Sequence, residues 1–189
     1  MKRPYRHMPE LIFGNYKLRT ISKSDAPDMF DYGKDIEVTR YLNWGPFTSL
    51  NDAKLSYKKI FKPRLRHGLP TGYAIVDLTK NKMIGTIDFH SKIKGENSAE
   101  IGYCLHRDYW NQGIMSQAIQ LIIKIGFQHL KYDLIRVKHL QSNVGSQKVI
   151  AKTQFKLIKK EPYLLEKVYG VLKDDMLIYE LKREDYDGN

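Results

Sequence analysis

A polar loop followed by a long apolar segment is the part of this sequence best suited to bind a charged ligand. The loop spans residues 106–116 (HRDYWNQGIMS), and Gly113 lies where the apolar segment is expected to begin as a helix. Backbone N–H groups at a helix N-terminus and the helix dipole favour phosphate, and glycine lets the backbone come close or adopt a positive φ. The segment therefore predicts a pyrophosphate site, although an ordinary helix-entry glycine explains Gly113 taken alone. It is neither a Walker sequence nor the dinucleotide-binding Gly-x-Gly-x-x-Gly.

Other reactive side chains are arranged in ways that exclude several chemistries. The six histidines include no pair at metal-binding helical spacing with a nearby carboxylate, so no metal site is expected. Cys104 lies in an apolar run, where a cysteine is more often a buried small hydrophobe than a nucleophile. Because it is the single cysteine, an intramolecular disulfide is excluded, which fits a reducing compartment and predicts a cytoplasmic protein. The sequence also lacks a Gly-x-Ser-x-Gly nucleophile elbow.

The elements that must position the loop follow from hydrophobic periodicity. Strands are expected at Tyr16–Ile21, Tyr73–Leu78, Met83–His90, Ala99–Leu105, Leu134–Leu140, Phe155–Lys160 and Asp175–Lys182. Helical segments are expected from Ser24 to about Gly33, over Ile36–Leu42, from Ser49 to Pro63, over Ser116–Leu130 and over Asn143–Lys152. Strands that enclose helices in a mixed sheet predict an α/β or α+β fold.

Length and composition favour one domain over residues 1–189, with residues 1–12 as a loose N-terminal extension. Hydrophobic residues make up 42% of the chain. No apolar run approaches the roughly 20 residues that a membrane span needs, and the basic N-terminus lacks the apolar stretch of a signal peptide, so no membrane partner is expected. The net charge of +11 would attract nucleic acid, acidic membranes or a polyanionic small molecule, or it is simply a solvated basic surface.

Residues 99–114 (AEIGYCLHRDYWNQGI) resemble the acetyl-CoA-binding segment of the GNAT acetyltransferases, above all the RimJ/RimL branch of ribosomal-protein-alanine N-acetyltransferases. Further matches at residues 17–19, 24–26, 84–87, 143–146 and 170–179 extend the resemblance over about residues 12–186. It implies a mixed, mostly antiparallel sheet of about seven strands, with flanking helices and a splayed central strand pair. Two residues depart from the family's usual Gln/Arg-x-x-Gly-x-Gly/Ala pattern. Trp110 is of a type familiar in this branch, whereas the bulk of Met115 predicts a different approach of the turn to the phosphates.

The resemblance implies acetyl-CoA as co-substrate. Backbone groups near Tyr103, Cys104 and Leu105 are expected to pair with the pantetheine arm as an added strand would. The loop amides would hold the pyrophosphate, and the asparagine of the family's Asn-x-x-Ser adds a contact; these residues are Gln112, Gly113, Ile114, Met115, Ser116 and Asn143. Without the family, Asn143 is simply the N-cap of a short helix.

Acetylation by direct attack requires a neutral amine, a route for its proton and a group that stabilises or protonates the leaving thiolate. Because an α-amine has a pKa of about 8, a modest base is sufficient. Glu100, at the start of the strand whose far end touches the cofactor, is the candidate base, and a solvent-facing strand-edge glutamate is the alternative. Ser146, the serine of Asn-x-x-Ser, is the candidate thiolate donor, and a first-turn helix residue is the alternative.

The acceptor pocket is the least readable part of the site. Asp88 and His90 alternate with Thr86 on one face of a strand and are candidates to line the pocket, although a hydrogen-bonded structural role is equally open. Trp44 lies in a cluster of aromatic residues after the early helices, where this fold commonly shapes the acceptor site. Core packing explains that cluster equally well.

The function expected from the sequence is an acetyl-CoA-dependent N-acetyltransferase whose acceptor is a primary amine, expected to be a protein N-terminal α-amine such as that of a ribosomal protein. The alternatives are a small-molecule amine, such as a polyamine or an antibiotic, and a non-catalytic RNA- or ribosome-binding module on the same fold. The positive charge disfavours a polycation and fits contact with RNA. Monomer and homodimer both remain open.

Overall fold

The computed structural model describes residues 8–67, 69–92 and 95–186. In this part of the chain the strands are β1 Leu11–Phe13, β2 Tyr16–Thr20, β3 Tyr73–Asp77, β4 Lys82–Ser91, β5 Ser98–Leu105, β6 Leu134–Leu140, β7 Lys156–Lys167 and β8 Gly170–Lys182. The α-helices are α1 Ala26–Gly33, α2 Ile36–Thr39, α3 Leu50–Ser56, α4 Ile114–Lys124 and α5 Val144–Ile150. Short 3₁₀ or π-helical turns are η1 Lys23–Asp25, η2 Tyr57–Phe61, η3 Lys62–His67, η4 Arg107–Tyr109, η5 Ile125–His129 and η6 Arg183–Asp185. None of these helices is long and apolar enough to cross a membrane.

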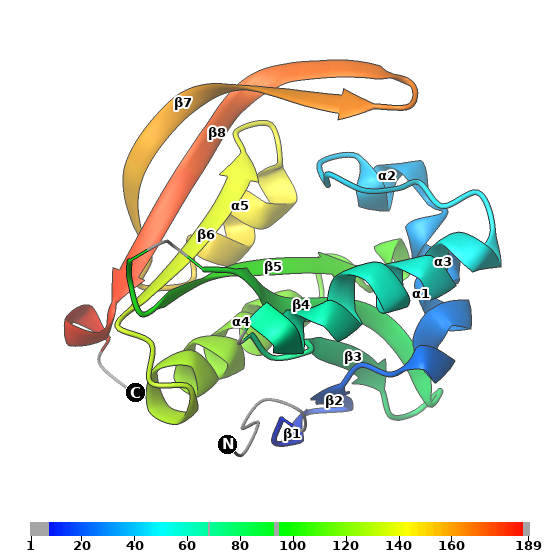
Figure 1. Ribbon diagram of the computed structural model, residues 1–189, viewed down its shortest axis with the longest axis horizontal. Coiled ribbons are helices and arrows are strands. Elements are labelled where there is room, and N and C mark those ends of the chain that lie inside the picture. Colours follow the sequence, from blue (N-terminus) through cyan, green and yellow to red (C-terminus); the bar gives the residue numbers. More distant parts are fainter. Residues whose placement is uncertain (1–7, 68, 93–94, 187–189) are drawn as a thin grey trace.

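The strands form one mixed sheet in the order β1-β2-β3-β4-β5-β6-β8-β7. Every neighbouring pair is antiparallel except β5 and β6, which run parallel. Pairing between β5 and β6 extends only from Ser98↔Leu134 to Ile101↔Val137. Beyond that point β6 rises away from β5 (Figure 1), which confirms the splayed central pair expected from the family resemblance.

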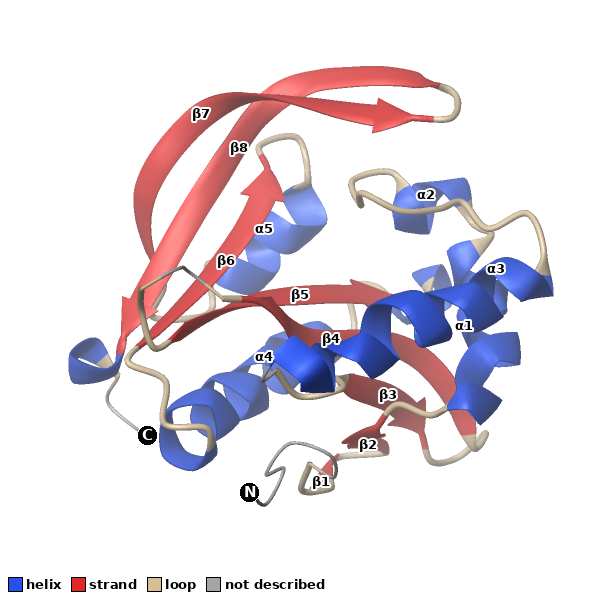
Figure 2. Ribbon diagram, viewed as in Figure 1, coloured by secondary structure: helices blue, strands red, loops and turns tan. Residues whose placement is uncertain are grey.

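Helices cover both faces of the sheet (Figure 2), and successive residues of β3 divide between two hydrophobic clusters. Ile75 belongs to the cluster built on α4, whereas Ala74 and Val76 belong to the cluster built on α1 and α3. The apolar stripe of α4 repeats at helical spacing and consists of Ile114, Met115, Ala118, Ile119, Ile122 and Ile123. The two clusters therefore pack against opposite faces of the sheet.

The N-terminal segment is more ordered than its sequence predicted. Met8 is buried, and Leu11–Phe13 pairs with β2 as an eighth strand because the chain turns back at Gly14, whose φ is +55°. Residues 8–12 are therefore not loose. The rest of the expected extension, residues 1–7, lies outside the described residues.

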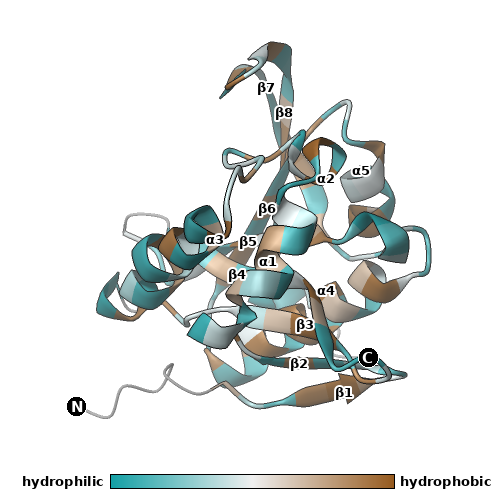
Figure 3. Cartoon of the chain, turned by 90° about the vertical axis from the view of Figure 1, so that its right-hand side faces the viewer, coloured by the Kyte–Doolittle hydropathy of each residue, from teal (hydrophilic) through white to brown (hydrophobic). Residues whose placement is uncertain are grey.

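The last two strands are longer than expected and form a hairpin that arches above α2 and α5 (Figures 1 and 3). The sequence predicted strands over Phe155–Lys160 and Asp175–Lys182, whereas the hairpin pairs residues from Lys156↔Glu180 to Lys167↔Gly170. Most of β7 is exposed, so the strand carries little of the alternation of buried and exposed residues that marks a strand in a sequence. The arch matters for function because it roofs the site.

Candidate active site

The fork between β5 and β6 shapes the site. Past Ile101↔Val137 one edge of β5, from Gly102 to Leu105, pairs with no other strand in the described chain. Backbone N–H and C=O groups must find hydrogen-bond partners, and an open strand edge can accept an extended chain as an added strand. Trp110 closes the far end of this edge, since its indole Nε1 donates to Leu105 O at 2.8 Å. This bond gives a structural reason for tryptophan at that position of the loop.

The loop ends in a left-handed glycine at the start of α4. Gly113 is the N-cap, with φ of 75° and ψ of 0°, a conformation that glycine adopts without strain. No heavy atom lies within 4 Å of the point where a Cβ would stand, so the outer side of the turn is open. The first backbone N–H groups of the helix, at Ile114, Met115 and Ser116, have no intrahelical acceptor. The turn therefore has the donors and the dipole of an anion site.

Met115 points away from that turn. Its side chain is buried in the hydrophobic cluster beneath α4, next to the equally buried Ile114. The extra volume of methionine is thus accommodated by the core. The expectation that its bulk would alter the approach to the phosphates finds no support in the direction of this side chain.

A cavity of about 870 Å³ extends from the fork to the space beneath the hairpin. Its walls come from β4, β5, β6, the hairpin, α1, residues 41–47 and the segment η2–η3. The cavity brings together eight of the residues singled out in the sequence, which are Trp44, Asp88, His90, Glu100, Tyr103, Cys104, Asn143 and Ser146. Its lining does not include Leu105 or residues 112–116, which lie at the far end of β5 and in the following turn.

Glu100 lies in the fork between a lysine of β6 and a histidine of β4. Its Oε2 lies 2.8 Å from Lys138 Nζ on β6, and its Oε1 lies 3.6 Å from His90 Nε2 on β4. The side chain is only 13% exposed, so the alternative of a solvent-facing edge glutamate is wrong. The carboxylate is therefore paired with a lysine of β6 and lies next to a histidine of β4.

Gly102 makes room for the His90 ring. A Cβ on Gly102 would stand 2.7 Å from His90 Cδ2 and 3.1 Å from His90 Nε2, so any larger residue would displace the imidazole. The other ring nitrogen, Nδ1, lies 2.7 Å from Ser91 Oγ. Since Gly102 is the first β5 residue beyond the paired region, His90 lies near the point where β5 and β6 part.

Asp88 forms a buried ion pair with Arg64 of η3. Arg64 Nη1 and Asp88 Oδ1 lie 2.8 Å apart, although the two groups are not aligned for a hydrogen bond. The guanidinium also lies over the Phe61 ring, 4.6 Å from its centroid. Because the ion pair occupies this carboxylate, Asp88 shapes the wall of the cavity and its charge is neutralised.

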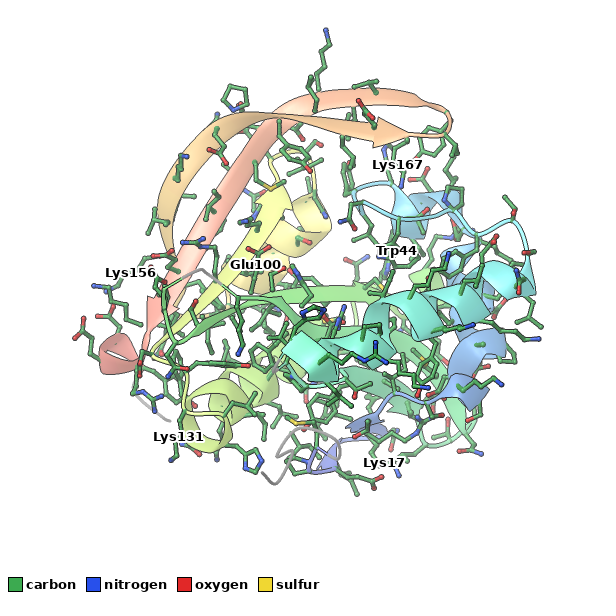
Figure 4. All side chains as sticks on the ribbon, viewed as in Figure 1. Lys17, Trp44, Glu100, Lys131, Lys156 and Lys167 are labelled. Atoms are coloured by element: carbon green, nitrogen blue, oxygen red, sulfur yellow. The ribbon has the colours of Figure 1, made fainter. Side chains whose placement is uncertain are left out.

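The β7–β8 hairpin forms the roof of the cavity, and hydrogen bonds join its tip to the aromatic end of the cavity. Trp44 stacks on Phe47, with ring centroids 5.1 Å apart. Lys167, near the tip of the hairpin, donates from Nζ to three carbonyl oxygens, at 3.0 Å to Thr39, 2.8 Å to Leu42 and 2.9 Å to Trp44. Desolvation in this cage lowers the pKa of Lys167. Figure 4 shows Lys167 above Trp44, with Glu100 to the left of both; Trp44 and Glu100 line the same cavity.

The cavity at the fork is lined by Tyr103 and Cys104 of β5 and by the start of α5. Asn143 Oδ1 accepts from Ser146 N at 3.0 Å, so the asparagine caps α5 as its sequence position allowed. The Ser146 side chain lies beside the Tyr103 hydroxyl, whose burial raises its pKa to about 12. Burial likewise raises the pKa of the Cys104 thiol to about 11, which fits a packed hydrophobe and not a nucleophile.

Four lining or clamping residues had no signal in the sequence. Arg64, Lys138 and His139 line the cavity, and Lys167 secures its roof. The role of each depends on a contact with residues distant in sequence or on burial by other elements, and neither can be recognised in a local sequence pattern. Among the described residues, no group of three or more His, Cys, Asp or Glu side chains is arranged to hold a metal ion.

The family of this chain follows from its similarity to known proteins. Residues 16–156 match the acetyltransferase (GNAT) domain family. The chain is 34% identical over 179 residues to the uncharacterized N-acetyltransferase p20 of Bacillus licheniformis. The alignment covers 94% of this chain and 98% of that protein. The chain therefore belongs to the GNAT acetyltransferase family and is an N-acetyltransferase.

Other relatives agree with this assignment. YoaA, an uncharacterized N-acetyltransferase of Bacillus subtilis (strain 168), is 28% identical over 152 residues, covering 80% of this chain and 84% of that protein. A GNAT-family acetyltransferase from Bacillus anthracis shares the fold, with a TM-score of 0.78, 22% identity and coverage of 93% of this chain and 99% of that one. RimL, a ribosomal L7/L12 alpha-N-protein acetyltransferase, superposes with a TM-score of 0.76 and 21% identity over 94% of each chain.

Proposed function

We propose that this N-acetyltransferase transfers the acetyl group of acetyl-CoA to the N-terminal α-amine of a protein in the cytoplasm, with a ribosomal protein as the candidate acceptor. The observation that carries the proposal is the charge state of the cavity. Each acidic residue of its described lining forms an ion pair with a basic side chain. The pairs are Asp88 with Arg64, Glu100 with Lys138, and Glu161 with Lys159 at 2.5 Å. No free carboxylate is left among them to bind a polycation.

This charge pattern disfavours a polyamine and favours an acceptor with a single amine. An α-amine, with a pKa of about 8, has a substantial neutral fraction at neutral pH, whereas a lysine amine, with a pKa of about 10.4, has almost none. An acceptor amine that is already partly neutral can be deprotonated by a weaker general base. A site whose carboxylates are all ion-paired therefore suits the α-amine.

The chain offers suitable groups for acetyl-CoA at three places. The open edge of β5 can pair with an extended arm, the turn at Gly113 presents amide donors for phosphates, and Tyr103 Oη is a buried hydroxyl with no hydrogen-bond partner in the described chain. When bound, acetyl-CoA supplies an activated acetyl thioester. RimL has been crystallised in complex with coenzyme A and acts on a ribosomal protein, which supports both the cofactor and the candidate acceptor proposed here.

The residues of the fork divide the remaining work. Glu100, held by Lys138 at 2.8 Å, takes the proton of the acceptor amine directly or through water. Ser146, in the first turn of α5, donates a hydrogen bond to the departing sulfur. Trp44, stacked on Phe47, forms the apolar wall along which the residues after the amine lie.

A basic rim suits an acceptor that is presented on RNA. The segment η2–η3, which contributes Lys59 to the cavity lining, carries four exposed cations, Lys58, Lys59, Lys62 and Arg66. Contacts of this kind weaken steeply as salt rises. Affinity for ribosomal RNA that is unchanged between low and high salt would count against this contact.

An acceptor panel tests the proposal. Release of free thiol from acetyl-CoA is measured with peptides that have free N-termini, with the same peptides blocked at the N-terminus, and with spermidine and an aminoglycoside. We expect turnover with the free peptides and background rates with all others. Turnover with spermidine or the aminoglycoside in place of the peptides would move the acceptor to the small-molecule class.

A further inference from the structure

Two buried polar atoms without partners face the fork from its two arms. Tyr103 lies two residues beyond Ile101 on β5, and His139 lies two residues beyond Val137 on β6, where Ile101↔Val137 is the last paired position. Since alternate residues of a strand share a face, both side chains lie on the same face of the sheet. Tyr103 Oη and His139 Nε2 are both buried without a hydrogen-bond partner in the described chain, and both residues line the cavity.

The hydrogen bonding of His139 determines what Nε2 can do. Its Nδ1 lies 2.9 Å from Leu140 O, and because a carbonyl only accepts, Nδ1 must carry the hydrogen. Desolvation lowers the pKa of the ring, so the neutral form prevails at neutral pH. In that tautomer Nε2 carries a lone pair and is an acceptor only.

Packing holds this acceptor in a fixed direction. The His139 ring stacks on Tyr179 of β8, with centroids 5.3 Å apart and an interplanar angle of 16°. The residue is only 5% exposed. A buried acceptor without a donor destabilises the protein, so the sequence keeps a feature here that packing alone does not explain.

We propose that His139 Nε2 accepts a hydrogen bond from an amide N–H of the pantetheine arm of acetyl-CoA, which makes His139 a positioning residue for the cofactor. This inference rests on the proposed function. Pantetheine carries amide N–H donors that lose their water on entering the fork and need acceptors there. The open edge of β5 serves the arm from one side, and His139 serves it from the other.

The test compares His139→Phe with His129→Phe, a control at an exposed position in η5. Phenylalanine preserves a ring for stacking on Tyr179 and removes the lone pair. The melting temperature of the free protein is measured together with calorimetric Kd values for acetyl-CoA and for adenosine 3′,5′-bisphosphate, which lacks the pantetheine arm.

For His139→Phe we expect an unchanged or higher melting temperature of the free protein, because a buried unsatisfied group is replaced by an apolar one. The Kd for acetyl-CoA should rise about three- to tenfold, the range of one neutral hydrogen bond, with the Kd for the bisphosphate unchanged. His139→Gln, which can present an acceptor oxygen, should recover part of the affinity and serves as the test if the phenylalanine variant does not fold.

A lower melting temperature with unchanged Kd for acetyl-CoA would show that His139 is purely structural and would overturn the inference. An equal loss of affinity for both ligands would do the same. If the unmodified protein fails to bind acetyl-CoA at all, the proposed function fails as well, so the two failures are distinguishable.

Discussion

Lys138 Nζ lies 2.8 Å from Glu100 Oε2, joining β6 to β5 at the point where the two strands part. The contact places a carboxylate where the pairing of the two strands ends, in the lining of the cavity. An ion pair that merely stabilised the sheet would not need to stand at this point.

Glu100→Gln should lower the turnover number about 100-fold, because the side chain keeps its shape but no longer takes a proton. The Kd for acetyl-CoA should stay within about twofold of the original value, because the proposed role of this residue is toward the acceptor amine. Steady-state kinetics and calorimetry measure the two quantities. Glu161→Gln, which changes another carboxylate of the same cavity, is the control and should leave the rate unchanged. Equal loss in both variants would mean that only cavity charge matters.

Met115→Ala should destabilise the protein without weakening cofactor binding. The buried methionine side chain contributes to the cluster beneath α4, and its truncation should cost about 2–4 kcal/mol in the free energy of unfolding. Urea titration measures the loss, and calorimetry at low temperature measures the Kd for acetyl-CoA. A large rise in Kd with little loss of stability would place the side chain at the phosphates after all.

Lys167→Met should loosen the roof of the site. The ammonium donates to the carbonyl of Thr39 at the end of α2 and to those of Leu42 and Trp44 in the loop that follows, and its loss frees the hairpin tip. We expect faster amide hydrogen exchange in residues 160–172 and a severalfold rise in KM for the acceptor peptide, with the Kd for acetyl-CoA unchanged. Lys173→Met, at an exposed position on β8, is the matched control. Identical exchange in both variants would refute a fastening role for Lys167.

Asp31 gives a pH dependence of stability. Hydrogen bonds from Lys82 and Lys34 lower its pKa from 3.8 to about 2. A lowered carboxylate pKa stabilises the fold above the unfolded-state pKa, and that contribution is lost as the pH falls toward 2. Asp31→Asn should therefore cost about 1 kcal/mol at pH 7, a modest value because the side chain is 34% exposed.

The difference between Asp31→Asn and the original protein should shrink between about pH 4 and pH 2. Urea unfolding curves recorded at several pH values measure it. A difference that stays constant across this range would exclude the carboxylate charge as its source.

The central strands could be read from the sequence because burial leaves a clear pattern in them. Leu134–Leu140 was predicted with its observed bounds, and the turn at Gly113 with its helix was placed within a few residues. The arch could not be read in the same way, since β7 is exposed along most of its length and contains Pro162, a residue that argues against a strand. Chain-wide family resemblance supplied the fork, which periodicity alone does not reveal.

A site residue could be predicted only where its type and its neighbours in sequence already indicate its role. Asn143 as a helix cap and Glu100 on its strand are of this kind. The three carbonyls around Lys167 lie more than 120 residues away in sequence, and the unpaired nitrogen of His139 exists only through burial by other strands. Such features follow from tertiary packing, which no local pattern records.

The most direct test of the proposed acceptor uses one peptide that carries both a free N-terminal α-amine and an internal lysine. After incubation with the enzyme and acetyl-CoA, fragmentation mass spectrometry locates the added acetyl group. We expect acetylation of the α-amine alone, at a rate that falls with Glu100→Gln. Acetyl on the lysine side chain, or an unmodified peptide with an enzyme that releases thiol to a small amine, would contradict this expectation.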